Sequence, residues 1–272
     1  MIELQNIFQH YSVRPILKHI SLEVAPGECV GIVGPNGMGK SSLLNVTSGV
    51  VTPQKGTVTI NGLLRKSSEE AELELRRIIA YLPDKPYLPS MMQLRHFLVT
   101  VGELYSIPDE RLFEHMDQLI TLFNLKEVAD SPLDSLSSGQ MKKAAICATL
   151  ITEAPIYLLD EPFSGGLDPA GIMALKKVLR NLSLSQQAIV VITAPVPEIL
   201  EELVTRVIVL HDGKVLFDET PEDLTGRART RCASSRDRRL GKLAFPETQN
   251  NINDYLGEKT KAWKKKSQDG MH

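Results

Sequence analysis

A glycine-rich segment from Gly34 to Ser41 carries the residue types that bind phosphate. It reads GPNGMGKS and matches the pattern G-x-x-x-x-G-K-[ST] at every fixed position. Glycines allow a backbone that turns successive N–H groups toward an anion. Within the segment, Lys40 would contact the β- and γ-phosphates of a nucleotide, and the Ser41 hydroxyl would coordinate Mg²⁺. The candidate binding residues are Gly34, Pro35, Asn36, Gly37, Met38, Gly39, Lys40, Ser41 and Ser42.

Two acidic residues follow an apolar run 120 residues after Lys40. Residues 156–159 are fully apolar and read as a buried strand, and Asp160 and Glu161 come directly after it. In phosphate-loop proteins an aspartate at such a position holds Mg²⁺, and a neighbouring carboxylate can act as general base toward water. We therefore predict Asp160 as a metal ligand and Glu161 as a catalytic residue. The alternative is a strand that simply ends in exposed acids.

The phosphate loop and the two acids need strands and helices to position them, and the sequence predicts these elements. Apolar runs predict strands, and Leu and Phe recurring at three and four residues predict helices. The predicted strands are 2–8, 20–24, 29–33, 57–61, 78–82, 156–159, 189–193 and 206–210. The predicted helices are 40–49, 139–151 and 172–182, with a mostly helical pattern over 87–129 that includes a helix start at Pro108. Strands alternating with helices indicate an α/β fold around a largely parallel, buried sheet.

A further motif lies between the phosphate loop and the acidic strand. Residues 136–140 read LSSGQ and begin 24 residues before Asp160. This motif resembles the signature of ATP-binding cassette (ABC) ATPases, and residues 162–169, PFSGGLDP, resemble the D-loop of that family. The resemblance covers residues 1–225 and implies a P-loop NTPase of the ABC ATPase type, with a helical subdomain at about residues 85–150.

The resemblance also implies how the site works. Two cassettes face each other head to tail, and each ATP lies between the phosphate loop of one and the signature motif of the other. Outside the phosphate loop, the implied nucleotide contacts are Tyr11, which would stack on adenine, and Ser137, Gly139, Gln140 and Asp168. From the residues alone, Ser137 or Ser138 also reads as an ordinary helix N-cap.

Four positions depart from the family's pattern. Asp84 stands where the family usually has glutamine, and export-type cassettes often carry an acid there. A carboxylate is still a hard oxygen ligand for Mg²⁺, so Asp84 stays a predicted catalytic residue and metal ligand. The signature's first glycine is Ser138, and the D-loop is one residue longer than usual. Strand 189–193 is followed by Ala194, where the family has a histidine that contacts the γ-phosphate. We therefore predict ATP binding with slow hydrolysis by a homodimer; the alternative is that Glu161 suffices as base.

Charge is distributed unevenly along the 272 residues. The net charge of −2 gives no global case for nucleic-acid binding. Residues 226–272 hold 12 Lys and Arg against five Asp and Glu, a net charge of +7, so residues 1–225 carry −9. The same segment is poor in large apolar residues, which predicts a basic, partly disordered extension with one helix near 252–266. Lys264–Lys266 beside Trp263 would contact anionic lipid or form a solvated end.

Three cysteines at unrelated spacings favour neither disulfides nor a zinc site, which predicts a reducing, cytoplasmic compartment. No segment reads as a secretory signal or a membrane span; the longest uncharged stretch is 181–197. Action at a membrane would therefore need a partner.

The implied function is the ATP-binding, ATP-hydrolysing subunit of an ABC transporter that uses ATP and Mg²⁺. It would power export through a separate integral membrane permease, from the inner face of the cell membrane. Leu88, Met91, Met92 and Phe97 would line the permease groove or belong to the core. The alternatives are a catalytically weakened partner in a heterodimer, and a soluble ABC ATPase without a transport role.

Overall fold

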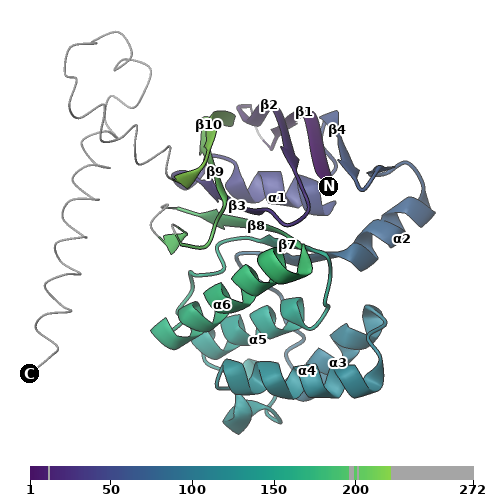
Figure 1. Ribbon diagram of the computed structural model, residues 1–272, viewed down its shortest axis with the longest axis vertical. Helices are drawn as coiled ribbons and strands as arrows, with labels where there is room; N and C mark the ends of the chain where they lie inside the picture. Colours follow the sequence, from purple (N-terminus) through teal and green to yellow (C-terminus); the bar gives the residue numbers. More distant parts are fainter. Residues whose placement is uncertain (12, 196–198, 201, 222–272) are drawn as a thin grey trace, which may run out of the picture. The chain divides into compact units, whose positions relative to one another are not determined.

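A six-stranded, mostly parallel sheet is the larger of two sheets in the computed structural model (Figure 1). The structure describes residues 1–11, 13–195, 199–200 and 202–221, which belong to one unit, Met1–Pro221. The strand order is β10–β9–β3–β8–β7–β6, and every neighbouring pair is parallel except the β9–β10 hairpin. The strands are β3 (Cys29–Val33), β6 (Ile79–Leu82), β7 (Ile156–Leu159), β8 (Ile189–Ala194), β9 (Arg206–His211) and β10 (Lys214–Glu219). The predicted parallel, buried sheet is confirmed, because β3, β7 and β8 are buried along their whole length.

A second, antiparallel sheet was not predicted from the sequence. It has the order β2–β1–β4–β5, with β1 (Ile2–His10), β2 (Pro15–Val24), β4 (Lys55–Ile60) and β5 (Leu63–Leu64). The first two strands are longer than the predicted runs because they pair as a hairpin out to His10 and Pro15. Asn61 and Gly62 form the turn between β4 and β5, as their hairpin-type sequence predicts.

Helix α1 (Lys40–Ser48) joins the two sheets into one core. Its residues Leu43, Leu44 and Val46 are buried in a cluster with Ile7 of the antiparallel sheet and Ile32 of the parallel sheet. Figure 1 shows α1 lying between the two sheets. Burial of these apolar side chains therefore fixes the helix that follows the phosphate loop against both layers.

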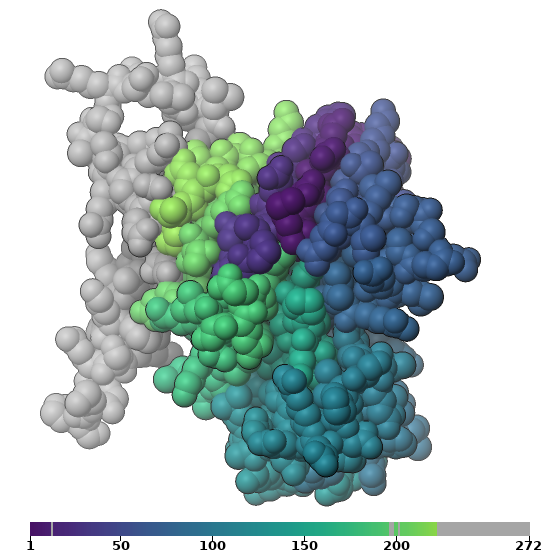
Figure 2. Space-filling model, turned by 45° about the vertical axis from the view of Figure 1, so that its right-hand side comes forward, coloured from purple at the N-terminus to yellow at the C-terminus, as the bar shows by residue number. Residues whose placement is uncertain are grey.

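The helices between β6 and β7 pack against one another. Helix α3 (Leu94–Leu104) contacts α4 (Asp109–Leu122) and α5 (Ser138–Leu150), and two short 3₁₀ turns lie between α4 and α5, at Lys126–Val128 and Leu133–Ser135. These helices form the teal part of the surface in Figure 2. Helix α4 begins at Asp109 after Pro108, as predicted. Residues 87–93, however, are not helical, so the helical pattern there was read too far toward the N-terminus.

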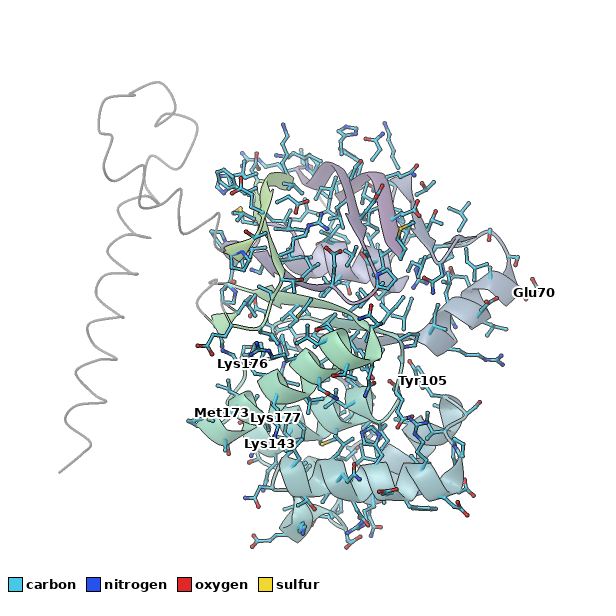
Figure 3. All side chains as sticks on the ribbon, in the orientation of Figure 1. Glu70, Tyr105, Lys143, Met173, Lys176 and Lys177 are labelled. Atoms are coloured by element: carbon cyan, nitrogen blue, oxygen red, sulfur yellow. The ribbon has the colours of Figure 1, made fainter. Side chains whose placement is uncertain are left out.

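The helix after the D-loop is longer than predicted. Helix α6 spans Pro169–Gln186, because the Asp168 side chain accepts a hydrogen bond from the Gly171 N–H at 2.7 Å and Pro169 occupies the first turn. A charged segment of the sequence near residue 70 forms another helix, α2 (Glu69–Ile78). Ser68 caps it, and Glu70 lies near its outer end (Figure 3).

Among the described residues, no helix is both long and apolar enough to cross a membrane. The predicted basic extension, residues 226–272 with its helix near 252–266, lies outside the described residues. The boundaries at 225 and at about 85–150 stay predictions.

Candidate nucleotide-binding and catalytic site

The phosphate loop connects the end of β3 to the start of α1, as predicted. Gly39 is the N-cap residue of α1, with φ of 102°, and a Cβ there would lie 2.8 Å from the Ile16 carbonyl oxygen. Gly34 has φ of 153°, and a Cβ there would meet the backbone oxygen of Leu210. Only glycine fits these two positions. No side chain caps α1 and its first turn has no acid, so its N-terminal amides can face a phosphate.

Lys40 is the only lysine of the loop, and its ammonium is buried beside two carboxylates. Its side chain is 4% exposed, and Nζ donates to the carbonyl oxygens of Gly34 at 2.8 Å and Pro35 at 3.3 Å. Nζ also lies 3.6 Å from Glu161 Oε1. Burial lowers the pKa of Lys40, while the charges of Glu161 and Asp160 oppose that shift. The loop therefore brings a cation to the acidic end of β7.

A threonine from the neighbouring strand joins the two acids. Asp160 is buried, and Thr193 Oγ1 donates to Asp160 Oδ1 at 2.5 Å. The same hydroxyl accepts a hydrogen bond from the Glu161 backbone N–H at 2.9 Å. Glu161 itself has φ of 45°, an uncommon conformation for a non-glycine residue. The Thr193 hydroxyl therefore helps to hold the metal-ligand candidate and the catalytic candidate in one arrangement.

Sequence reasoning assigned no role to Thr193. The sequence holds part of the signal, because Thr193 is the single hydroxyl residue in the strand IVVITA. That this strand lies beside β7, which ends just before Asp160, is seen only in the structure. Buried polar groups need partners, and the nearest strand end supplies one.

Replacing Thr193 with valine is expected to destabilise the fold by about 1–3 kcal/mol, because it removes the hydrogen bonds that its hydroxyl makes with Asp160 Oδ1 and the Glu161 N–H. Urea unfolding measures this loss. The Thr193→Ser variant keeps the hydroxyl and should unfold close to wild type. Thr149→Val is the matched control, since the buried Thr149 hydroxyl donates only to the Ala145 carbonyl within α5. Equal stability of Thr193→Val and Thr149→Val would contradict the bridging role.

Asp84 is the second residue after β6, the strand next to β7. Ser164 Oγ donates to the Glu161 carbonyl oxygen at 2.8 Å and lies 3.4 Å from Asp84 Oδ1. Lys142 Nζ donates to the Asp84 carbonyl oxygen at 3.3 Å. The charges of Asp84 and Asp160 both act on the hydroxyl of Tyr81, whose pKa is raised mainly by burial. Asp84 and Asp160 therefore lie at the same edge of the sheet, near the phosphate loop.

The oxygen donors at this edge suit Mg²⁺. Ser41 supplies a hydroxyl, and Asp160 and Asp84 supply carboxylates, all hard donors of the kind that Mg²⁺ takes alongside nucleotide phosphates. Within the described residues, no group of three or more His, Cys, Asp or Glu could hold a metal ion by itself.

Ser137 and Gln140 are engaged at the start of α5. Ser137 Oγ accepts from the Gln140 N–H at 3.3 Å, and Gln140 Oε1 accepts from the Ser137 N–H at 2.9 Å, which is a capping box. The N-cap interpretation of this motif is therefore confirmed. Gly139 packs against the D-loop, since a Cβ there would lie 2.8 Å from the Gly166 carbonyl oxygen.

The remaining candidates are Asp168 and Tyr11, and Ala194 stands where the family has its histidine. Asp168 caps α6 and also accepts from Lys143 Nζ at 2.8 Å, which lowers the pKa of Asp168. Figure 3 places Lys143 where α5 passes α6. Tyr11 follows β1 and is 59% exposed. Ala194 is 2% exposed and pairs with Val33, the residue before the phosphate loop. The nucleotide contacts of Asp168 and Tyr11 stay predictions.

A family model and the relatives and solved structures described below all point to one family. The family model described as ABC transporter matches residues 17–164. The chain is 29% identical over 225 residues to the lipopolysaccharide export system ATP-binding protein of Acidithiobacillus ferridurans, covering 82% of this chain and 92% of that one. It is 30% identical over 229 residues to the cobalt import ATP-binding protein of Salmonella paratyphi A, covering 82% of each.

Two further likenesses cover most of the chain. It is 28% identical over 282 residues to the energy-coupling factor transporter ATP-binding protein of Methanocaldococcus jannaschii, covering 95% of this chain and 99% of that one. A solved ATP-binding subunit of an ABC transporter has a TM-score of 0.78 at 26% identity, covering 86% of this chain and 95% of its own. Since the family model matches more than half of the sequence, this protein belongs to the ABC transporter family, as one of its ATP-binding cassettes.

Proposed function

We propose that this cassette hydrolyses ATP with Mg²⁺ and drives a separate membrane permease, in the direction of export. The observation that carries the proposal is the loop after β6. Its first part brings Asp84 to the acidic end of β7, and its next residues, Pro86, Tyr87 and Leu88, line an open groove beside α3 and α5. One short segment therefore touches both the chemical site and a surface that a partner can reach.

Each group has a separate task in the proposed reaction. Lys40 and the amides of the phosphate loop bind the phosphates, and Asp160, Ser41 and Asp84 hold Mg²⁺. When bound, Mg²⁺ neutralises charge on the phosphates. Glu161 accepts a proton from the attacking water, because its carboxylate lies beside Lys40 at the phosphate loop.

The proposed active form is a dimer in which Ser137, Gly139 and Gln140 of one cassette face the nucleotide on the phosphate loop of the other. A solved cassette that is dimeric in a post-hydrolysis state with ADP and Pi, 25% identical with a TM-score of 0.71, supports a dimeric form. Ala194 has no donor for the γ-phosphate, so we propose slow turnover. The same residue supports the second candidate, in which this chain is the weaker member of a heterodimer.

The direction and place of action are part of the proposal. The acid at position 84 and the lipopolysaccharide export relative support export, whereas the cobalt relative is named for import. We propose that the cassette comprises residues 1–225, that its helical subdomain covers about 85–150, and that it works on the cytoplasmic face of the membrane, held there by the permease.

The groove is a cavity of about 210 Å³. Leu88 and Phe97 line it, as expected for two of the four apolar candidates, whereas Met91 and Met92 do not. Tyr87 is 93% exposed and also lines a neighbouring groove of about 530 Å³ that includes Met141. An exposed aromatic ring between two grooves is the kind of residue that dominates docking.

Replacing Tyr87 with aspartate is expected to weaken capture of a multi-span membrane protein from solubilised membranes by about tenfold or more, because truncated aromatic anchors typically cost about 2 kcal/mol. Affinity capture of the tagged full chain measures this. Leu73→Asp on α2 is the matched control, since Leu73 is also exposed but lines neither groove. Recovery of soluble proteins alone by the wild-type chain would favour a non-transport ATPase and contradict the proposal.

A further inference from the structure

Lys142 is a buried lysine in α5 to which no role has been assigned so far. It is 5% exposed and lies two residues after Gln140 of the signature motif. Its Nζ donates to the Asp84 carbonyl oxygen at 3.3 Å, so the start of α5 is tied to the loop after β6. Burying an ammonium is costly unless carboxylates lie nearby, and the partners of Lys142 are therefore informative.

The charges of three carboxylates act on this ammonium. Burial lowers the pKa of Lys142, and the charges of Asp84, Asp160 and Glu161 oppose that shift, in that order. Lys40 interacts with Glu161 and Asp160 from the phosphate loop. The cluster thus contains three carboxylates and two ammonium groups, which leaves one negative charge. Without Lys142 it would carry two negative charges where an anionic nucleotide must bind.

The two neighbouring lysines of α5 serve different partners. Lys143 Nζ pairs with Asp168 at 2.8 Å, at the start of α6. Lys142 faces Asp84, and both residues line the 530 Å³ groove together with Gly165 of the D-loop. A Cβ at Gly165 would lie 3.9 Å from Lys142 Cδ, so the lysine stem passes close to the D-loop. Lys142 is therefore a buried cation that interacts with the acid at position 84, in addition to Lys85, which lines the same groove.

We propose that Lys142 is a positioning residue that offsets the negative charge of Asp84 and holds the loop after β6 against α5, so that the site accepts an anionic nucleotide. The inference rests on the proposed function, because it concerns the same nucleotide site. It explains how a cassette can carry a carboxylate at position 84, since that charge comes with a cation 58 residues later in the chain.

The test is a double-mutant cycle read by the Kd of ADP in EDTA, so that Mg²⁺ ligation by Asp84 does not enter. Lys142→Gln should weaken ADP binding by about tenfold, and Asp84→Asn should restore it to within about twofold of wild type. Lys142→Arg keeps the charge and should bind like wild type. The matched control is Lys143→Gln, whose effect should be the same with Asp84 and with Asn at that position.

Each outcome decides. A double variant that binds ADP as weakly as Lys142→Gln alone, or weak binding by Lys142→Arg equal to that of Lys142→Gln, would overturn the inference. If Lys142→Gln does not fold but the double variant does, the rescue supports it. If neither folds, Asp84→Asn alone should bind ADP about tenfold more tightly than wild type, and unchanged binding would overturn it. A wild-type chain that binds neither ADP nor ATP would instead contradict the proposed function.

Discussion

Replacing Glu161 with glutamine is expected to lower ATP turnover by about 10²–10⁴-fold while nucleotide binding persists. Glutamine has the same shape but accepts no proton. The Glu161 backbone is held by the Thr193 hydroxyl, and its carboxylate lies 3.6 Å from Lys40 Nζ. The rate loss should therefore come from the missing base rather than from a displaced side chain. Phosphate release at saturating ATP and Mg²⁺ measures it, and ATP titration checks binding.

Glu103→Gln is the control for this experiment, since Glu103 is an exposed residue of α3 away from the site. Its turnover should match wild type. Turnover of Glu161→Gln within about threefold of wild type would assign the proton to another group, because a general base is worth far more than that.

The companion variant is Ala194→His, which asks how much the missing donor slows the reaction. One preorganised donor is worth roughly 10²–10³ in turnover, so the histidine should raise kcat by at least about tenfold. Since Ala194 is 2% exposed, a thermal melt must first show that the variant folds. An unchanged kcat in a folded variant would favour the alternative in which Glu161 suffices.

Replacing Lys40 with methionine is expected to weaken ATP binding by about 2–5 kcal/mol, or roughly 30- to 4,000-fold. Methionine keeps most of the buried stem but removes the charge that faces Glu161 and Asp160. The two carboxylates then repel the phosphates more strongly than in the wild type. Titration calorimetry with ATP and Mg²⁺ measures the affinity of the full chain.

Lys214→Met serves as the matched control, because Lys214 is exposed on β10 and should leave affinity unchanged. An affinity of Lys40→Met equal to that of the control would mean that the backbone of the loop carries the binding. The buried position of Lys40 and its 2.8 Å contact with the Gly34 carbonyl argue against that result.

The parts of the site that follow from sequence are those within a few residues of each other. The phosphate loop needs only a strand, glycines and a helix start, and all three are local. The strand end at Asp160 is similarly readable from its apolar run. Contacts between side chains on different strands could not be predicted from local sequence patterns. Thr193 meets Asp160 only because β8 lies beside β7, and Lys142 reaches Asp84 across 58 positions.

The fold shows the same division. Most strands and helices were predicted from periodicity, but the antiparallel sheet was not, because pairing of β1 with β4 joins segments about 50 residues apart. Helix α6 was predicted too short because Asp168 and Pro169 were read only as part of the D-loop. The same two residues are a capping residue and a first-turn proline, which is a helix start.

The position of β6 in the sheet has a mechanical consequence. β3, β7 and β8, which carry the phosphate loop, Asp160 and Thr193, each have a strand on both sides, whereas β6 is at the edge and pairs with β7 alone. A force applied to Tyr87 would therefore load a single ladder, Ile79–Leu82, before any strand of the interior. The inner strands are held by hydrogen bonds on both sides, whereas β6 is held on one side. A force on the loop after β6 would therefore displace Asp84 more easily than the phosphate loop.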